Sequence, residues 1–269
     1  MKWSGSKDSQ AKNIINYFPK KIDTYREPFL GGGSVFLKLL ESDIEVNSYY
    51  LSDINKELIG IYQLIMNDPD LLIDTYNNHY KEFNIDDDIQ HRKEYFNEIR
   101  NNFNENKKSE DFYFIMRTVT SGLPRWNQSG KFNSSCHFTR SGMMPESVDK
   151  IIKKYNKLFN SKNIIFSQES YENIKSNEND IIYMDPPYQN TKGMYYGGFN
   201  SEKFINWLDL LSSKWILSYN GKINDDKIEH FGPNNYKRHE YLISGNSSFR
   251  RIKEASNDTI ISESLYLNF

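Results

Sequence analysis

Cysteine is almost absent from this chain of 269 residues, in which Cys136 is the single example. One cysteine excludes a disulfide within the chain and any zinc site built from several cysteines. The sequence also lacks an apolar run long enough to span a membrane, and its polar amino terminus contains no apolar signal region. We therefore expect a soluble protein of a reducing cytoplasm.

A strong net charge is missing too, since 34 Lys and Arg face 36 Asp and Glu, giving −2. The whole-chain charge thus gives no sign of a nucleic-acid partner, but residues 112–145 contain no acid and residues 237–253 are rich in Lys and Arg. The basic residues of the first stretch are Arg117, Arg125, Lys131 and Arg140. Local basic surfaces are typical of phosphate contact, although a solvated surface gives the same pattern.

The spacing of apolar residues predicts two groups of α/β elements around a largely helical middle. Helices are expected at 10–18, 34–40, 56–66, 112–119 and 147–159, and strands at 49–52, 164–166, 181–184, 215–218 and 260–267. The polar residues 70–110 predict solvated helices and loops, and the Gly, Pro, Asn and Ser of 122–133 predict a loop or hairpin. We expect residues 1–57 and 160–269 to form one discontinuous α/β domain, with 58–159 as an inserted domain.

Three successive glycines, Gly31-Gly32-Gly33, precede the helix expected at 34–40. Such a turn lets a ligand approach the backbone beside a helix amino terminus, but a flexible turn is the alternative. No lysine follows the glycines, so the P-loop pattern for phosphates is absent. Asp53, after an expected strand, occupies the place where an acidic side chain binds ribose in nucleoside-binding α/β folds. S-adenosylmethionine, which has a ribose and no phosphate, satisfies both conditions.

The tetrapeptide Asp185-Pro186-Pro187-Tyr188 follows the buried strand expected at 181–184. Open α/β sheets bind ligands at the carboxyl ends of their strands, where Asp185 lies. The prolines stiffen the turn by fixing two φ angles and removing two backbone donors. A carboxylate beside the Tyr188 ring could stack a planar base and accept hydrogen bonds from its exocyclic amine. An ordinary turn after a strand is the alternative.

Taken together, these motifs resemble those of the α group of DNA adenine-N6 methyltransferases, the Dam-like, D12-class family. The resemblance covers essentially the whole chain, and it rests on the order of the motifs, with a recognition region between the cofactor loop and the catalytic tetrapeptide. The matching segments are Lys2-Trp3-Ser4-Gly5-Ser6-Lys7, Pro28-Phe29-Leu30-Gly31-Gly32-Gly33, Asp53-Ile54-Asn55, the hairpin-like residues 125–133, Asp185-Pro186-Pro187-Tyr188, and residues 263–269.

The resemblance implies a Rossmann-like class I methyltransferase fold with a mixed, mostly parallel seven-stranded sheet. Residues 1–57 and 160–269 would be the catalytic domain that binds S-adenosylmethionine, and 58–159 a mainly helical target-recognition domain with a β-hairpin. The activity would be site-specific methylation of adenine N6 in double-stranded DNA by base flipping, without a metal, leaving S-adenosylhomocysteine. A monomer or weak dimer is implied. A cognate restriction endonuclease would act on the same DNA site without binding this chain.

The resemblance also assigns roles to individual residues. The target base would enter a slot made by Asp185, the Pro186 carbonyl, Pro187 and Tyr188, in which the carboxylate orients the amine. The cofactor contacts would be Trp3, Lys7, Phe29, Gly31, Gly32, Gly33, Asp53, Ser170, Tyr171 and Asp185. The DNA contacts would be Arg117, Arg125, Asn127, Lys131, Asn133 and Arg140.

One segment departs from the family pattern. Members that read GATC usually continue with a Pro-Phe-Gly type sequence after Phe132-Asn133, whereas this chain has residues 134–140 as Ser-Ser-Cys-His-Phe-Thr-Arg. The recognised DNA sequence is therefore left open. Arg125 could read guanine through its two major-groove acceptors, or could contact a phosphate, which is the favoured role for Lys131 and Arg140.

Two other functions remain as alternatives. A methyltransferase could act on a protein glutamine or an RNA adenine, but glutamine enzymes usually have Asn where this chain has Asp185, and the hairpin favours duplex DNA. A non-catalytic DNA-binding module could descend from such enzymes, but the intact glycines, Asp53 and Asp185 argue against this.

Overall fold

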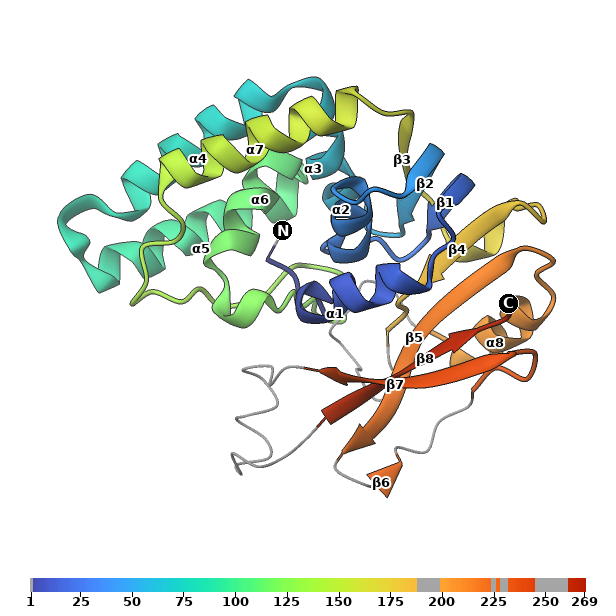
Figure 1. Cartoon of the computed structure of the whole chain (residues 1–269). Helices are drawn as coiled ribbons and strands as arrows, with labels where there is room; N and C mark the ends of the chain where they lie inside the picture. The colour runs from blue at the N-terminus through green and yellow to red at the C-terminus, as the bar shows by residue number, and fades with distance from the viewer. Residues whose placement is uncertain (1, 188–198, 224–225, 228–231, 245–260) are drawn as a thin grey trace. The chain divides into compact units, whose positions relative to one another are not determined.

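The computed structural model describes residues 2–187, 199–223, 226–227, 232–244 and 261–269 (Figure 1). Its contacts divide the chain into two compact units. The first contains residues 2–5 and 53–168, and the second contains the described residues of 6–52 and 169–269. The domain division predicted from the sequence stays a prediction, because compact packing alone does not show which part folds by itself.

The strands form a mixed sheet with the order β3-β2-β1-β4-β5-β8-β7, and β6 pairs with β5 outside this path. Their bounds are β1 Lys21–Glu27, β2 Glu45–Asp53, β3 Ile164–Gln168, β4 Asp180–Met184, β5 Lys214–Ile223, β6 Asp226–Lys227, β7 Arg238–Ser244 and β8 Ile261–Leu267. β1 runs parallel to β2 and β4, and β4 parallel to β5, whereas β8 is antiparallel to β5 and β7. The predicted mixed, mostly parallel seven-stranded sheet is confirmed.

The core of the second unit lies between β4, β5 and helix α8, Ser201–Asp209. Every residue of β4 is buried, as expected for a central parallel strand covered on both faces. Ile182 and Met184 of β4 and Trp215 of β5 pack against Phe204 and Leu208 of α8. Helices α1, Asp8–Ile14, and α2, Ser34–Leu40, also belong to this unit and contact each other. This core fixes the residue that follows β4.

Five helices make up most of the first unit, in which α6 contacts α3, α4 and α5, and α7 contacts α3 and α4 (Figure 1). They are α3 Lys56–Asn67, α4 Pro69–Phe83, α5 Ile89–Asn106, α6 Ser109–Thr118 and α7 Pro145–Asn160. The side chains of Asn55, Asp68 and Asp88 accept hydrogen bonds from backbone amides at the starts of α3, α4 and α5. All residues from Phe112 to Met116 of α6 are buried, which confirms the predicted buried helix.

Three strands of the second unit, β1, β6 and β7, are missing from the sequence-based expectations. β1 carries charged residues at four of its seven positions, and β7 lies in a stretch interpreted as a basic surface. Alternating burial of polar and apolar positions explains β1, because one side of a strand can stay polar while the other packs. Within the described part of the chain, no helix is both long and apolar enough to cross a membrane.

Candidate active site

A glycine turn joins β1 to α2. Gly31 and Gly33 have φ angles of +47° and +68°, in the left-handed region that strains a residue with a β-carbon. The Gly33 amide donates to the Leu30 carbonyl at 2.7 Å, and α2 begins at Ser34. The Ser34 hydroxyl lies 2.6 Å from that of Ser6, so the segment before α1 is tied to the start of α2. A ligand at this turn would meet backbone instead of bulky side chains.

Aromatic rings border the same turn. The Phe29 ring stacks on Tyr171, with centroids 5.4 Å apart and planes 30° apart. Phe204 of α8 presents its edge to both rings, at 5.5 and 5.3 Å. The Ser170 hydroxyl accepts a hydrogen bond from the Glu172 amide and so shapes the turn that carries Tyr171. The structure therefore brings together Phe29, Ser170 and Tyr171, three of the expected cofactor contacts.

Asp185, the residue immediately after β4, is held by a lysine. Both carboxylate oxygens of Asp185 lie 2.7 Å from Nζ of Lys7, which precedes α1. The Lys7 side chain is only 6% exposed and that of Asp185 only 18%. The Lys7 carbonyl accepts the amides of Gln10 and Ala11, so its backbone is fixed at the start of the helix. Two residues far apart in the chain thus form one buried ion pair.

A second carboxylate faces the same lysine. Oε2 of Glu263 in β8 lies 3.4 Å from Nζ of Lys7. Burial alone would lower the pKa of Lys7, but Asp185, Glu263 and the Tyr183 phenol outweigh it and raise this pKa above the ordinary 10.5. The ammonium therefore stays charged at neutral pH.

Two buried phenols of the second unit remain neutral. The Tyr183 hydroxyl lies 2.8 Å from that of Ser218, and burial followed by the charge of Asp185 raises the pKa of Tyr183 well above its ordinary range. Tyr25 donates to Glu27 at 2.6 Å, and burial and the Glu27 charge raise its pKa in the same direction. Neither phenol can supply a negative charge near neutral pH.

The other expected site residues include Trp3, Asp53, Pro186, Pro187 and Tyr188. Trp3 and Asp53 belong to the first unit, where the Trp3 ring meets the Phe112 ring edge-on at 6.4 Å. Asp53 ends β2, and its carboxylate accepts the amide of Asn55 at 3.0 Å. Pro186 and Pro187 follow Asp185 directly, and Pro186 is buried. Tyr188 lies outside the described residues.

The first unit contains the expected hairpin. Trp126 and Phe132 form an antiparallel bridge, and the Asn133 amide donates to the Arg125 carbonyl at 2.9 Å. At the tip, the Asn127 side chain accepts from the backbone of Ser129 and of Lys131. The expected DNA contacts in this hairpin are all exposed, namely Arg125, Asn127, Lys131 and Asn133. The hairpin presents its polar side chains to solvent on a closed backbone turn.

A single asparagine of α5 anchors this hairpin. Asn104 accepts the Phe132 amide at 2.8 Å and donates to the Phe132 carbonyl at 2.9 Å. The buried Phe132 ring meets Phe103 and Phe112 edge-on, at 6.0 and 5.7 Å. Phe132 therefore fixes the hairpin to the helices, and Arg100 of α5 also donates to the adjoining Ser134 carbonyl at 3.2 Å, while the tip stays exposed.

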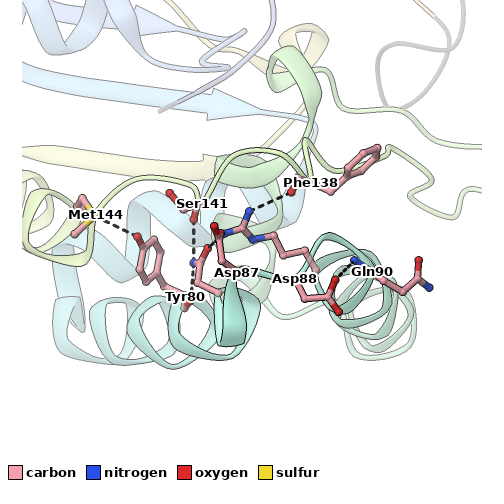
Figure 2. Close-up of polar contacts among 9 residues, drawn as sticks. Tyr80, Asp87, Asp88, Gln90, Phe138, Ser141 and Met144 are labelled. Atoms are coloured by element: carbon pink, nitrogen blue, oxygen red, sulfur yellow. Dashed lines mark hydrogen bonds and ion pairs between the residues drawn. The ribbon is translucent and has the colours of Figure 1, made fainter.

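The segment that departs from the family pattern is also fixed in place. Figure 2 shows polar contacts around Phe138, Ser141 and Met144. Arg92 of α5 donates to the Phe138 carbonyl at 3.3 Å and also bonds Asp87, and Asn84 donates to the Ser141 carbonyl at 3.1 Å. These contacts hold the turn that carries the exposed Arg140.

Positive charges gather in the first unit. Burial first, then Arg117 and Arg140, lower the pKa of Lys2. The Lys2 ammonium donates to the Val119 carbonyl at 2.8 Å, and Arg117 contacts the Met143 sulfur at 2.7 Å. Cations that repel one another in this way favour binding of an anion such as a phosphate.

Comparison with known proteins identifies the family. The model of D12 class N6 adenine-specific DNA methyltransferases matches residues 3–240. The chain belongs to this family. It is 30% identical to Type II methyltransferase M.MjaIII of Methanocaldococcus jannaschii over 86% of each chain. It is also 30% identical to a DNA adenine methylase of Vibrio cholerae, and 27% to Type II methyltransferase M1.LlaDCHI of Lactococcus lactis subsp. cremoris, each over 70% of this chain and 64% of the relative.

Several residues with the contacts described above escape reasoning from sequence alone in this D12-class chain. Glu263 and Glu27 are isolated acids in strands, and Asn104 is one of many asparagines in a polar helix. The only signal for Glu263 is its place in the terminal segment that resembles the family. No cluster of three metal-binding side chains occurs among the described residues.

Proposed function

We propose that this D12-class methyltransferase binds S-adenosylmethionine at the turn Gly31–Gly33 and methylates N6 of an adenine swung out of duplex DNA. Asp185 is the catalytic carboxylate. The single observation that carries the proposal is the place of Asp185, directly after the central strand β4 and fixed through both oxygens by a buried lysine.

The residues of the glycine turn suit this cofactor. Left-handed Gly31 and Gly33 leave the backbone accessible, and the stacked Phe29 and Tyr171 offer aromatic surface for an adenine ring. No lysine follows the glycines to neutralise a phosphate, and S-adenosylmethionine has none. Asp53 for the ribose, with Trp3 and Lys7, remain predicted contacts. The cofactor supplies the methyl group as an electrophilic sulfonium.

Asp185 is suited to orient an amine. A carboxylate oxygen can accept more than one hydrogen bond, so Asp185 can accept the N6 hydrogens while it is paired with Lys7. Accepting these hydrogens, together with the Pro186 carbonyl, keeps the nitrogen lone pair directed at the methyl group. Asp185 then stabilises the positive charge that develops on N6. A carboxylate of ordinary pKa near 3.9 is a weak base for a neutral amine, so orientation and electrostatics dominate.

Duplex DNA is the proposed substrate because N6 of a stacked adenine cannot reach a buried methyl donor. Swinging the base out costs a few kcal/mol, which stacking on Tyr188 and contacts of the hairpin would offset. Arg125 is the proposed guanine reader, with Asn127 and Asn133 beside it, and Lys131, Arg117 and Arg140 are proposed phosphate contacts. Service in a restriction–modification system, with an endonuclease for the same site, is the proposed role.

The test is transfer of tritium from labelled S-adenosylmethionine to DNA, with RNA and protein offered in parallel. Asp185→Ala should lower the methylation rate at least ~10²-fold, the scale for losing one transition-state-stabilising group. Its affinity for the cofactor should largely survive. Asp43→Ala, at an exposed position of the same unit, is the control. Near-full turnover by Asp185→Ala would show that Asp185 is not the catalytic carboxylate.

A further inference from the structure

Glu263 is a buried acid in β8 and is not among the expected site residues. Its side chain is 11% exposed, and its carboxylate lies 3.4 Å from the ammonium of Lys7. The same ammonium binds both oxygens of Asp185 at 2.7 Å. Burying a charge is costly unless the charge is paired, so a second acid beside an already paired lysine calls for a reason.

The pairing of β5 with β8 is irregular at this acid. Tyr219 faces Ser264 and Lys222 faces Ser262, so two residues of β5, Asn220 and Gly221, lie opposite Glu263 alone. This arrangement is a β-bulge, a feature that re-aims a side chain next to active sites.

Gly221 makes this bulge possible. A β-carbon at Gly221 would lie 2.8 Å from Cα of Glu263 and 2.2 Å from the Ser262 carbonyl oxygen, closer than real atoms approach. Only glycine lets the β8 backbone come this near. The position of Glu263 is therefore specified by its partner strand as well as by its own.

The charges explain what a second acid does. A lysine paired with Asp185 alone would form a neutral pair. The positive field of that lysine would then oppose the stabilisation of a positive charge on a substrate amine. One lysine between two carboxylates leaves one net negative charge in the cluster. Lys7 has three donors, and two of them meet Asp185, so the ammonium can also be drawn toward Glu263.

We propose that Glu263 is a positioning residue, which holds Lys7 from the β8 side so that Asp185 keeps both its orientation and its negative charge for the target amine. The inference rests on the proposed function, because the negative charge of this cluster is inferred to stabilise the nitrogen that accepts the methyl group. Glu263 acts through Lys7 and need not touch the substrate.

The test compares Glu263→Gln, which keeps the shape and removes the charge, with Glu263→Asp, which keeps the charge. Single-turnover methylation at saturating cofactor and DNA isolates the chemical step from product release. Glu263→Gln should be slower by roughly 10-fold, a loss within the range of coupling between residues of one ion-pair network. The dissociation constant for S-adenosylmethionine should be unchanged, and Glu263→Asp should recover part of the rate. Glu178→Gln, at an exposed position of the same unit, is the control.

The outcomes separate the two proposals. Absence of methyl transfer to DNA by the wild-type protein would refute the proposed function. An active wild type with Glu263→Gln equal to Glu178→Gln would overturn only the role of Glu263. A Glu263→Asp variant as slow as Glu263→Gln would also overturn it, since packing and not charge would then matter. Gly221→Ala offers an independent check, because it should slow the reaction with every charge in place.

Discussion

Replacing Lys7 by Met is the sharpest test of the buried ion cluster. The ammonium is 6% exposed and faces Asp185 at 2.7 Å and Glu263 at 3.4 Å, so its loss leaves two carboxylates without their cation. Removing one partner of a buried pair costs about 3–5 kcal/mol. The two acids are 18% and 11% exposed, which gives them some solvent and favours the lower end, about 3 kcal/mol. Met fills similar space, so little of this loss comes from packing.

The assay is thermal unfolding of the whole chain, followed by circular dichroism. A loss of about 3 kcal/mol should lower the melting temperature by roughly 6–12 °C for a chain of this size. Lys12→Met, at an exposed position of the helix α1 that follows Lys7, should leave the melting temperature unchanged. Adding Glu263→Gln to Lys7→Met removes one unpaired acid and should restore about 1 kcal/mol. Equal melting temperatures for Lys7→Met and Lys12→Met would refute this account of the cluster.

The pH dependence has a definite sign. The carboxylates raise the folded-state pKa of Lys7 above its unfolded value of 10.5. The stabilisation from this residue is therefore fully present below about pH 10.5 and is lost only as pH rises through the folded-state pKa. The difference in stability between wild type and Lys7→Met should accordingly shrink in strong alkali. A difference that grows there would contradict the assignment.

Two further predictions concern the hairpin of residues 125–133. Arg125→Ala should cost ~1–3 kcal/mol of discrimination, measured as relative methylation of the preferred duplex and of single-base variants, whereas an equal loss on every sequence would make Arg125 a phosphate contact. Asn104→Leu removes both hydrogen bonds to Phe132, each worth about 1 kcal/mol net, so hydrogen exchange at the Phe132 amide should become about 30-fold faster. The control is the exposed Asn101→Leu, and unchanged exchange in Asn104→Leu would show that the hairpin is held elsewhere.

Local signals explain which parts of the fold were predictable. β4 is apolar from Ile181 to Met184, and α6 is apolar from Phe112 to Met116, so both stand out from their surroundings. Residues 70–110 contain α4 and α5, which bury Tyr76, Phe83, Phe96 and Phe103 within polar sequence, so solvated helices describe only their outer faces. β1 and β7 escape because each is charged at alternate positions, and only pairing with neighbours makes such segments strands.

The candidate site likewise contains residues that could be predicted from the sequence and residues that could not. Glycines and the tetrapeptide at Asp185 are visible in sequence because their chemistry requires adjacent residues. Lys7 was expected against the cofactor, and the structure pairs it with Asp185, a contact between positions far apart in the chain. Glu263 depends on a bulge in another strand, and Asn104 on a hairpin that folds back onto α5. Long-range contacts of this kind leave no local pattern to read.

The cluster at Asp185 also resolves a conflict between two requirements. A catalytic carboxylate in a buried place must remain ionised, and a nearby cation is the direct way to ensure this. The same cation weakens the field that the carboxylate offers to a positive charge developing on the substrate. A third, negatively charged group beside the cation restores the negative field, while the cation still keeps the carboxylate ionised. Lys7 with Glu263 therefore does what neither could do alone, and the rate of methyl transfer should depend on both charges.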